Sequence, residues 1–169
     1  MIVGHPAQHL VRRGAGAFVL EREPGGASLR TKPARGGWDI EGDDLAEGWF
    51  LRREEGPGGG FSLRAGGADR EVDRTLGLEG VGQQRDLRYL LMGDGRLFRI
   101  ALRGPKDSRF ELSGWETPGA YLTARPQAEG WRIEPNPASG GIPDIRALSL
   151  LFAAEILDSE EPLGNGEPI

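Results

Sequence analysis

The sequence predicts a mainly β protein, an antiparallel barrel or strongly curled sheet of about ten short strands around one hydrophobic C-terminal helix. The chain of 169 residues contains 28 glycines and 12 prolines, which separate short apolar runs as turns separate strands. One segment, residues 143–157, instead has the length and composition of a buried helix. A chain of this length can bury the core of one domain, and its hydrophobic content of 37% is low, as expected for many short strands joined by turns.

The predicted helix is apolar on nearly all sides. Ten of the thirteen residues 145–157 are apolar, and Arg146 and Glu155 lie on opposite sides at helical spacing. Pro143 and Asp144 suit its first turn. Thirteen residues rise about 20 Å, less than the roughly 20 residues that a bilayer span needs. We therefore expect a central helix wrapped by strands and no transmembrane segment.

The ends of the chain differ in composition from its middle. Residues 1–16 have no clear period and predict a loosely ordered N-terminal arm, whereas 17–157 form the single domain. Residues 158–169 are acidic and rich in proline and glycine, which predicts a disordered tail. The N-terminus has no apolar signal segment after a positive charge, so we expect a cytoplasmic protein.

Several runs of β-forming residues lie between these ends. The clearest pair is a hairpin with a Gly-Asp-Gly turn at residues 93–95, because apolar residues alternate with arginines in its second strand. The expected strands lie within 17–23, 27–32, 38–41, 49–53, 61–64, 87–92, 96–102, 109–112, 120–124 and 131–134.

All four tryptophans directly follow a glycine, and two of these pairs extend to a longer match. The pattern Gly-Trp-x-Ile-Glu occurs at residues 37–41 and again at 130–134. A glycine at a positive φ could start each strand, with the indole covering one end of the core. Chance similarity and a true duplication both remain open explanations.

The last third of the chain resembles the tubby-like barrel superfamily, which includes the LURP-one-related proteins and the phospholipid scramblases. The resemblance lies in residues 119–125, 130–134 and 144–157, where a polar strand pair leads into an alanine- and leucine-rich helix. It implies a closed antiparallel barrel around the helix and a leaning toward lipid or partner binding. The cysteine-rich and proline-rich segments of scramblases are absent, and no functional residue of the family can be placed here.

The charge pattern supplies the candidate binding residues. The net charge of −5 argues against nucleic-acid binding, but residues 85–109 carry seven basic and three acidic side chains. A strand in this strip would group arginines able to bind phosphate or carboxylate groups, unless acidic residues of the chain neutralise them. The candidates are Arg88, Arg96, Arg99 and Arg103. Glu155 is a further polar residue of interest, because enclosure in the helix would require a partner.

Catalytic and metal-binding patterns are weak. The chain has no cysteine, and its histidines, His5 and His9, are expected to be solvated. The acidic cluster of Asp39, Glu41, Asp43, Asp44 and Glu47 lacks the spacing of a calcium loop. We therefore expect no metal and no cofactor.

The function that these features favour is a non-enzymatic binding or scaffold module. Its partner would be an anionic lipid headgroup or an acidic protein. The alternative is an enzyme or small-ligand carrier with a cavity at the barrel mouth, using Glu155 or the acidic cluster. A third hypothesis is a homo-oligomer in which the basic strip of one copy contacts the acidic C-terminal part of another copy.

Overall fold

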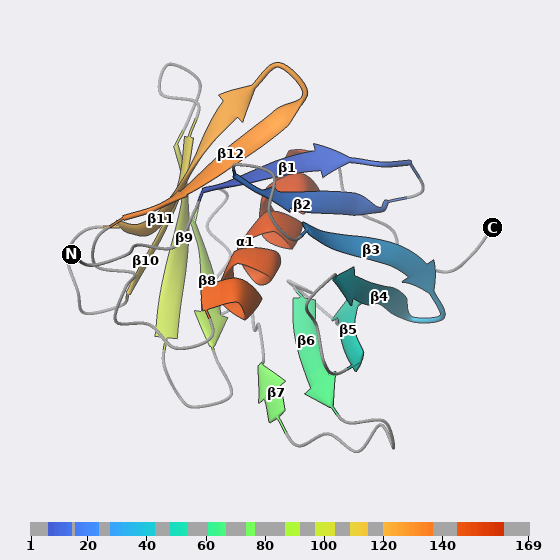
Figure 1. Cartoon of the computed structure of the whole chain (residues 1–169). Helices are drawn as coiled ribbons and strands as arrows, with labels where there is room; N and C mark the ends of the chain where they lie inside the picture. Colours follow the sequence, from blue (N-terminus) through green and yellow to red (C-terminus); the bar gives the residue numbers. More distant parts are fainter. Residues whose placement is uncertain are drawn as a thin grey trace, which may run out of the picture.

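The computed structural model describes residues 7–14, 16–23, 28–42, 48–53, 61–66, 74–76, 87–91, 97–103, 109–114, 120–136 and 145–160. They form one antiparallel sheet and one C-terminal helix, which confirms the predicted fold class (Figure 1). The helix is α1 (Ile145–Glu160). The strands are β1 (Gln8–Arg12), β2 (Phe18–Arg22), β3 (Ser28–Ala34), β4 (Gly37–Gly42), β5 (Gly48–Arg53), β6 (Phe61–Gly66), β7 (Arg74–Leu76), β8 (Leu87–Leu91), β9 (Leu97–Arg103), β10 (Arg109–Gly114), β11 (Ala120–Gln127) and β12 (Gly130–Pro135).

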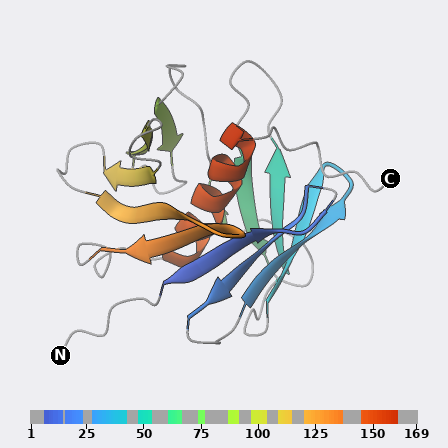
Figure 2. The ribbon, with the colours of Figure 1, turned by 90° about the horizontal axis from the view of Figure 1, so that it is seen from above.

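The sheet curls around α1. The strand order is β7-β6-β5-β4-β3-β2-β1-β12-β11-β10-β9-β8, so β7 and β8 are its two edges. The two ends of the sheet flank the helix from different sides (Figures 1 and 2). Within the described residues β7 and β8 are not paired, so this part of the chain forms a strongly curled sheet and not a closed barrel.

The helix fills the concave side of the sheet. Every described apolar side chain of α1 is at most 1% exposed, as expected for a helix that is apolar on nearly all sides. The sheet residues that pack around it include Leu10, Trp38, Ile100 and Leu112. Strand residues alternate between this core and solvent, for example in β2, where Phe18 and Leu20 are buried and Glu21 is exposed.

Regular structure extends into both of the terminal segments that were predicted to lack it. The prediction of a loose arm over residues 1–16 is wrong for Gln8–Arg12, because β1 lies inside the sheet between β2 and β12. Gln8 and Leu10 take the buried positions of β1, and the polar Gln8 hides the apolar alternation in the sequence. The helix also extends to Glu160, three residues into the predicted tail. Residues 161–169 lie outside the described residues.

The two copies of Gly-Trp-x-Ile-Glu occupy equivalent places in the sheet. Each copy forms the second strand of a hairpin, β3–β4 or β11–β12, with two residues in the turn. In both hairpins the tryptophan pairs with a proline, Pro33 with Trp38 and Pro126 with Trp131. The preceding strand also matches, since a leucine pair joins β2 to β3 and β10 to β11. These shared registers favour duplication over chance.

The strand that follows each hairpin completes a four-stranded repeat. Trp38 pairs with Leu51 of β5, and Trp131 pairs with Leu10 of β1. The first repeat unit is therefore β2–β5, and the second repeat unit is β10, β11, β12 and β1, although β1 comes from the start of the chain. The chain thus builds the second unit from both of its ends.

The glycine before each tryptophan is required by close packing. A Cβ atom at Gly37 would lie 2.1 Å from the Leu51 carbonyl oxygen, and one at Gly130 would lie 1.9 Å from that of Leu10. Neither glycine is among the described glycines with a positive φ. The expected reason for glycine, a positive φ, is therefore wrong here, because the neighbouring strand leaves no room for a side chain.

Candidate functional site

The C-terminal end of α1 receives one arginine from each repeat unit. Arg12 lies two residues after Leu10, and Arg53 lies two residues after Leu51, so they occupy equivalent positions on β1 and β5. The last turn of α1 contains no basic residue, and its unpaired carbonyl groups carry partial negative charge. The two arginines supply the missing positive charge from the sheet.

The first repeat unit forms a tight contact, which we call the closed clamp: Arg53, Asp158, Phe61 and Trp38. Arg53 Nη1 donates to Asp158 Oδ1 at 2.8 Å, and the Asp158 side chain is 7% exposed. The guanidinium lies over the Phe61 ring, 5.1 Å from its centroid. Trp38 packs against Phe61 with the ring centroids 5.9 Å apart. The Asp158 carboxylate is thus largely shielded from solvent.

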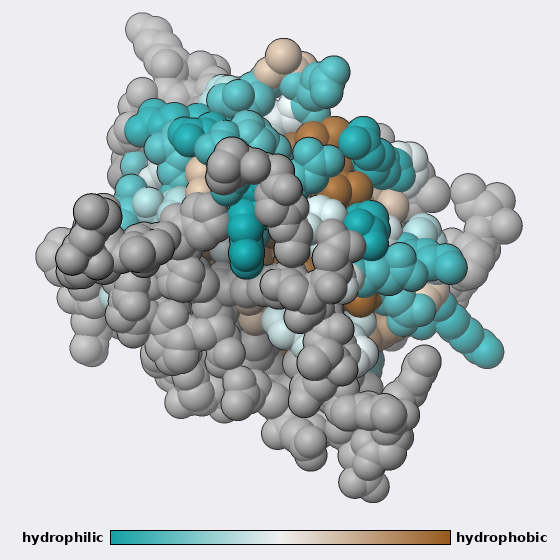
Figure 3. Space-filling model, in the orientation of Figure 1, coloured by the Kyte–Doolittle hydropathy of each residue, from teal (hydrophilic) through white to brown (hydrophobic). Residues whose placement is uncertain are grey.

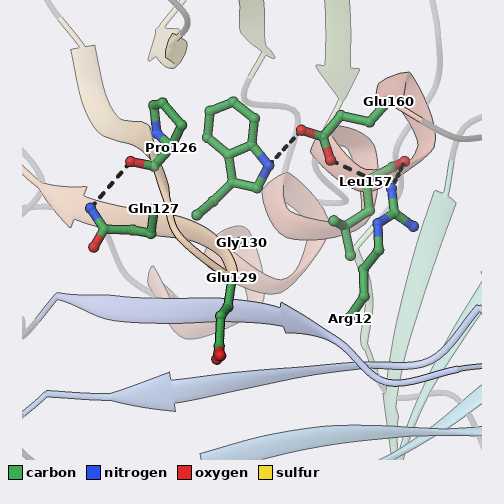
Figure 4. A pocket seen from close by; sticks show the side chains of 8 residues that line it. Arg12, Pro126, Gln127, Glu129, Gly130, Leu157 and Glu160 are labelled. Atoms are coloured by element: carbon green, nitrogen blue, oxygen red, sulfur yellow. Dashed lines mark hydrogen bonds and ion pairs between the residues drawn. The ribbon is translucent and has the colours of Figure 1, made fainter.

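The second repeat unit forms a looser contact, which we call the open clamp: Arg12, Glu160, Leu157 and Trp131. Arg12 Nη2 donates to the Leu157 carbonyl oxygen at 2.8 Å and lies 3.5 Å from Glu160 Oε2. Trp131 Nε1 donates to the other oxygen, Glu160 Oε1, at 2.7 Å (Figure 4). The side chains of Arg12 and Glu160 are 34% and 37% exposed. Solvent therefore reaches this carboxylate.

A pocket of about 310 Å³ opens beside the open clamp (Figure 4). Its charged groups are Arg12, Glu129 and Glu160, one positive and two negative, and the end of α1 adds further negative potential. Trp131 and Pro126 contribute apolar wall. The full lining is Arg12, Pro126, Gln127, Glu129, Gly130, Trp131, Leu157 and Glu160. These charges favour a cationic group in the pocket.

Sequence reasoning missed this site. Arg12 falls in the segment predicted to be a loosely ordered arm, and Glu160 falls in the segment predicted to be a disordered tail. Trp131 was part of the recognised repeat, but the sequence did not indicate what its indole would bind. The one available signal was the acidic C-terminal end of α1, which needs cations from elsewhere in the fold.

A charged network covers the outer face of the sheet where the repeat units meet. Arg132 donates twice to Glu23, at 2.9 and 3.1 Å, and His9 also contacts Glu23. The bonds from Arg132, followed by the contact with His9, lower the pKa of Glu23 to about 2. Glu23 in turn raises the pKa of Arg132 above its ordinary value. Arg132 Nη1 also lies 2.7 Å from Glu134 Oε1, so one guanidinium contacts two carboxylates.

The same outer face has an apolar part. Val11 and Val19 pair across β1 and β2, and both are half-buried. In the space-filling view apolar surface is visible in the region of β1, between hydrophilic residues (Figure 3). The exterior of the sheet next to the open clamp is therefore mixed in character.

The predicted arginines are not all placed on one surface. Arg99 is exposed on β9, and Arg103 shares its side of the strand by register. Arg88 pairs with Ile100, whereas Arg99 pairs with Tyr89, so Arg88 and Arg99 occupy register positions on opposite sides of the sheet. Arg96 lies outside the described residues.

The other predicted polar groups are partly described. Glu155 is 2% exposed on α1 and has a hydrogen-bonding or electrostatic interaction. Of the acidic cluster, Asp39 and Glu41 lie on β4, and the remaining three residues lie outside the described residues. His5 also lies outside them, whereas His9 belongs to the outer network.

The described residues contain no group of three or more histidine, aspartate or glutamate side chains able to hold a metal ion. No helix in the described part of the chain combines the length and apolar character needed to cross a membrane.

Comparison of the chain with protein-family models, with curated proteins and with solved structures gave no match. The site must therefore be interpreted from its own geometry and charge.

Proposed function

We propose that the protein is a non-enzymatic binding module that takes a cationic group of its ligand in the pocket beside the open clamp. The observation that carries this proposal is the solvent-accessible Glu160 carboxylate, which lines a pocket with an excess of negative charge. A ligand ammonium or guanidinium would reach Glu160 without crossing the core. This is the carrier-like alternative from the sequence, with Glu160 in the role once considered for Glu155.

Glu160 has acceptor capacity to spare. An ionised carboxylate offers about four lone-pair sites, and the contacts with Trp131 and Arg12 use two. The Trp131 bond fixes the orientation of the carboxylate, while Arg12 lies at the limit of hydrogen-bonding distance. The carboxylate is thus positioned for an added donor from solvent.

The test is a titration with small cations followed by NMR. The probes are Nα-acetyl-lysine amide and Nα-acetyl-arginine amide, whose side chains are free and charged, with Nα-acetyl-norleucine amide as the uncharged control. Binding of one charged side chain should be weak, about millimolar, and should weaken further with salt. Glu160→Gln should abolish it, whereas Glu41→Gln, on the exposed end of the other motif copy, should not. Unchanged binding in Glu160→Gln would refute the proposal.

A second candidate is the surface predicted from the arginine strip. Arg99 is exposed, and Arg103 follows on the same side of β9, so this side could meet a phosphate or carboxylate group. The test is co-sedimentation with neutral and anionic vesicles, comparing wild type with Arg99→Glu/Arg103→Glu. Binding that requires anionic lipid and is lost in the variant would support this candidate. The proposed tubby-like relationship rests on the sequence alone.

A further inference from the structure

We infer that the pocket beside the open clamp selects a guanidinium group over an ammonium group, so that its ligand carries an arginine side chain or a related guanidine. This inference rests on the proposed cation-binding function and names the chemistry of the ligand. It follows from a comparison of the two clamps, because the same end of α1 already binds two guanidinium groups of the chain itself.

The closed clamp shows what a guanidinium gains at the end of α1. Arg53 donates to Asp158 at 2.8 Å and places its planar group over Phe61. A guanidinium suits both contacts, because it presents a fork of donors to a carboxylate and is weakly hydrated enough to stack on a ring. An ammonium is a strongly hydrated point charge and loses more on entering such a site. The closed clamp, which combines Arg53 of β5 with Phe61 of β6 and Asp158 of α1, is thus a guanidinium site.

The open clamp also places a carboxylate at the end of α1, and that carboxylate, Glu160, keeps lone pairs accessible to solvent. Arg12 directs Nη2 to the Leu157 carbonyl oxygen at 2.8 Å and remains 3.5 Å from Glu160. Glu160 is 37% exposed, whereas Asp158 in the closed clamp is 7% exposed. The pocket lies where a second guanidinium would approach Glu160, with Trp131 and Pro126 beside it. A ligand guanidinium would pair with Glu160 as Arg53 pairs with Asp158.

Two sources of this group are chemically equivalent at the carboxylate. The first is arginine or another small guanidine, and the second is an arginine side chain in a peptide. A pocket of about 310 Å³ that is open to solvent accommodates the side chain in either case. The experiment therefore includes both kinds of probe.

The indole signal of Trp131 reports directly on the site. Its Nε1–H donates to Glu160, so a new donor on the carboxylate should move this signal in a ¹⁵N–¹H correlation spectrum. Trp38 is the matched internal control, because it is the equivalent residue of the first unit, is fully buried, and its Nε1 has no hydrogen-bond partner in the described structure. Trp131→Phe and Trp38→Phe assign the two signals.

Wild-type protein is titrated with five probes: acetyl-arginine amide, acetyl-lysine amide, acetyl-citrulline amide, arginine, and a blocked Ala-Arg-Ala peptide. We expect the arginine probes to shift the Trp131 signal to saturation, the lysine probe to bind about tenfold more weakly, and the citrulline probe to cause no shift. The Trp38 signal should stay in place. Tighter binding of the peptide would identify a protein segment as the source, and tighter binding of arginine a small molecule; both support the inference.

The failures of the two proposals are distinguishable. Equal affinity for the lysine and arginine probes would overturn guanidinium selection and leave cation binding intact. No shift with any cation would refute both. Glu160→Gln should lose the arginine response while its Trp38 signal remains at the wild-type position, which shows that the variant is folded. A retained response in this variant would also overturn the inference.

Discussion

The closed clamp and the open clamp begin from the same local structure and end in different environments. In both, a Gly-Trp strand packs against a neighbouring strand whose arginine reaches the end of α1. In the first unit the carboxylate is buried and its arginine, 27% exposed, lies over Phe61. In the second unit both groups are about one third exposed, beside a pocket.

The two tryptophans show the same division. Trp38 is fully buried, and in the described structure its Nε1 has no hydrogen-bond partner, so it contributes through packing alone. Trp131 is 8% exposed and packs on Phe110, with the ring centroids 4.6 Å apart. Its Nε1 donates to Glu160. One copy of the motif therefore stabilises the core, whereas the other also orients a solvent-accessible carboxylate. The second unit is therefore the better candidate for a ligand-binding site.

The largest expected effect comes from the glycine that both units share. Gly37→Ala and Gly130→Ala would each place a Cβ within about 2 Å of a carbonyl oxygen, so the strands must separate. We expect each to lower the free energy of unfolding by about 3 kcal/mol, the upper range for overpacking. Urea unfolding measures this.

Gly48→Ala is the control for these two variants, because nothing lies within 4 Å of a Cβ at that position. It should change the free energy of unfolding by less than about 0.5 kcal/mol. A harmless Gly130→Ala with a damaging Gly37→Ala would show that the second unit is loose in its backbone as well as in its clamp.

The next largest effect should separate the clamps. Arg53→Met leaves the buried Asp158 carboxylate without this guanidinium, which should cost about 2–3 kcal/mol, below the full range for a buried pair because Arg53 is 27% exposed. Arg12→Met removes a carbonyl contact and an exposed pair and should cost about 1 kcal/mol. Thermal unfolding of both variants gives the comparison, and equal losses would contradict it.

The fold was predictable because its signals are repeated and strong. A helix with ten apolar residues in thirteen has one stable environment, and glycine and proline between short apolar runs leave strands to provide it. The strand count was low because β7 has only three residues and β1 has the polar Gln8 at a buried position. The order of the sheet could not be read, since β1 joins β12 from the opposite end of the chain.

The site was not predictable because its members are brought together only by the fold. Arg12 and Glu160 are separated by nearly the whole chain, and each lies in a segment whose composition resembles a disordered end. The arginine strip was visible in the sequence, yet alternation within β8 and β9 assigns Arg88 and Arg99 to opposite sides. A one-residue difference in register decides such a grouping.

Acid should reveal a difference between the outer faces of the two units. The pKa of Glu23 is lowered from 4.5 to about 2, chiefly by Arg132, which belongs to the second unit. A lowered folded-state pKa contributes stability that is fully present above about pH 4.5 and is lost as the pH falls toward 2. The residue equivalent to Arg132 in the first unit is Asp39, whose negative charge cannot lower the pKa of a neighbouring carboxyl group.

Glu23→Gln tests this contribution. The wild type should lose more free energy of unfolding than the variant between about pH 5 and pH 2, because only the wild type must protonate this carboxylate. Urea unfolding across this range gives the two slopes. Parallel pH profiles would show that Glu23 keeps its ion pairs in the unfolded chain or lacks them in the folded protein.

The smallest effect on the free energy of unfolding is expected at a position that is exposed in both hairpins. Lys32 and Arg125 occupy the equivalent position before the shared proline, and both are exposed. Arg125 lies 3.8 Å from Glu134 with its side chain 52% exposed, a distance and exposure at which an ion pair contributes little. Lys32→Ala and Arg125→Ala should each change the free energy of unfolding by less than about 0.5 kcal/mol. A loss above about 1 kcal/mol in Arg125→Ala alone would mean that Arg125 acts cooperatively with Glu134, Arg132 and Glu23. The ion pairs on the outer face would then stabilise the second unit, as the closed clamp stabilises the first unit.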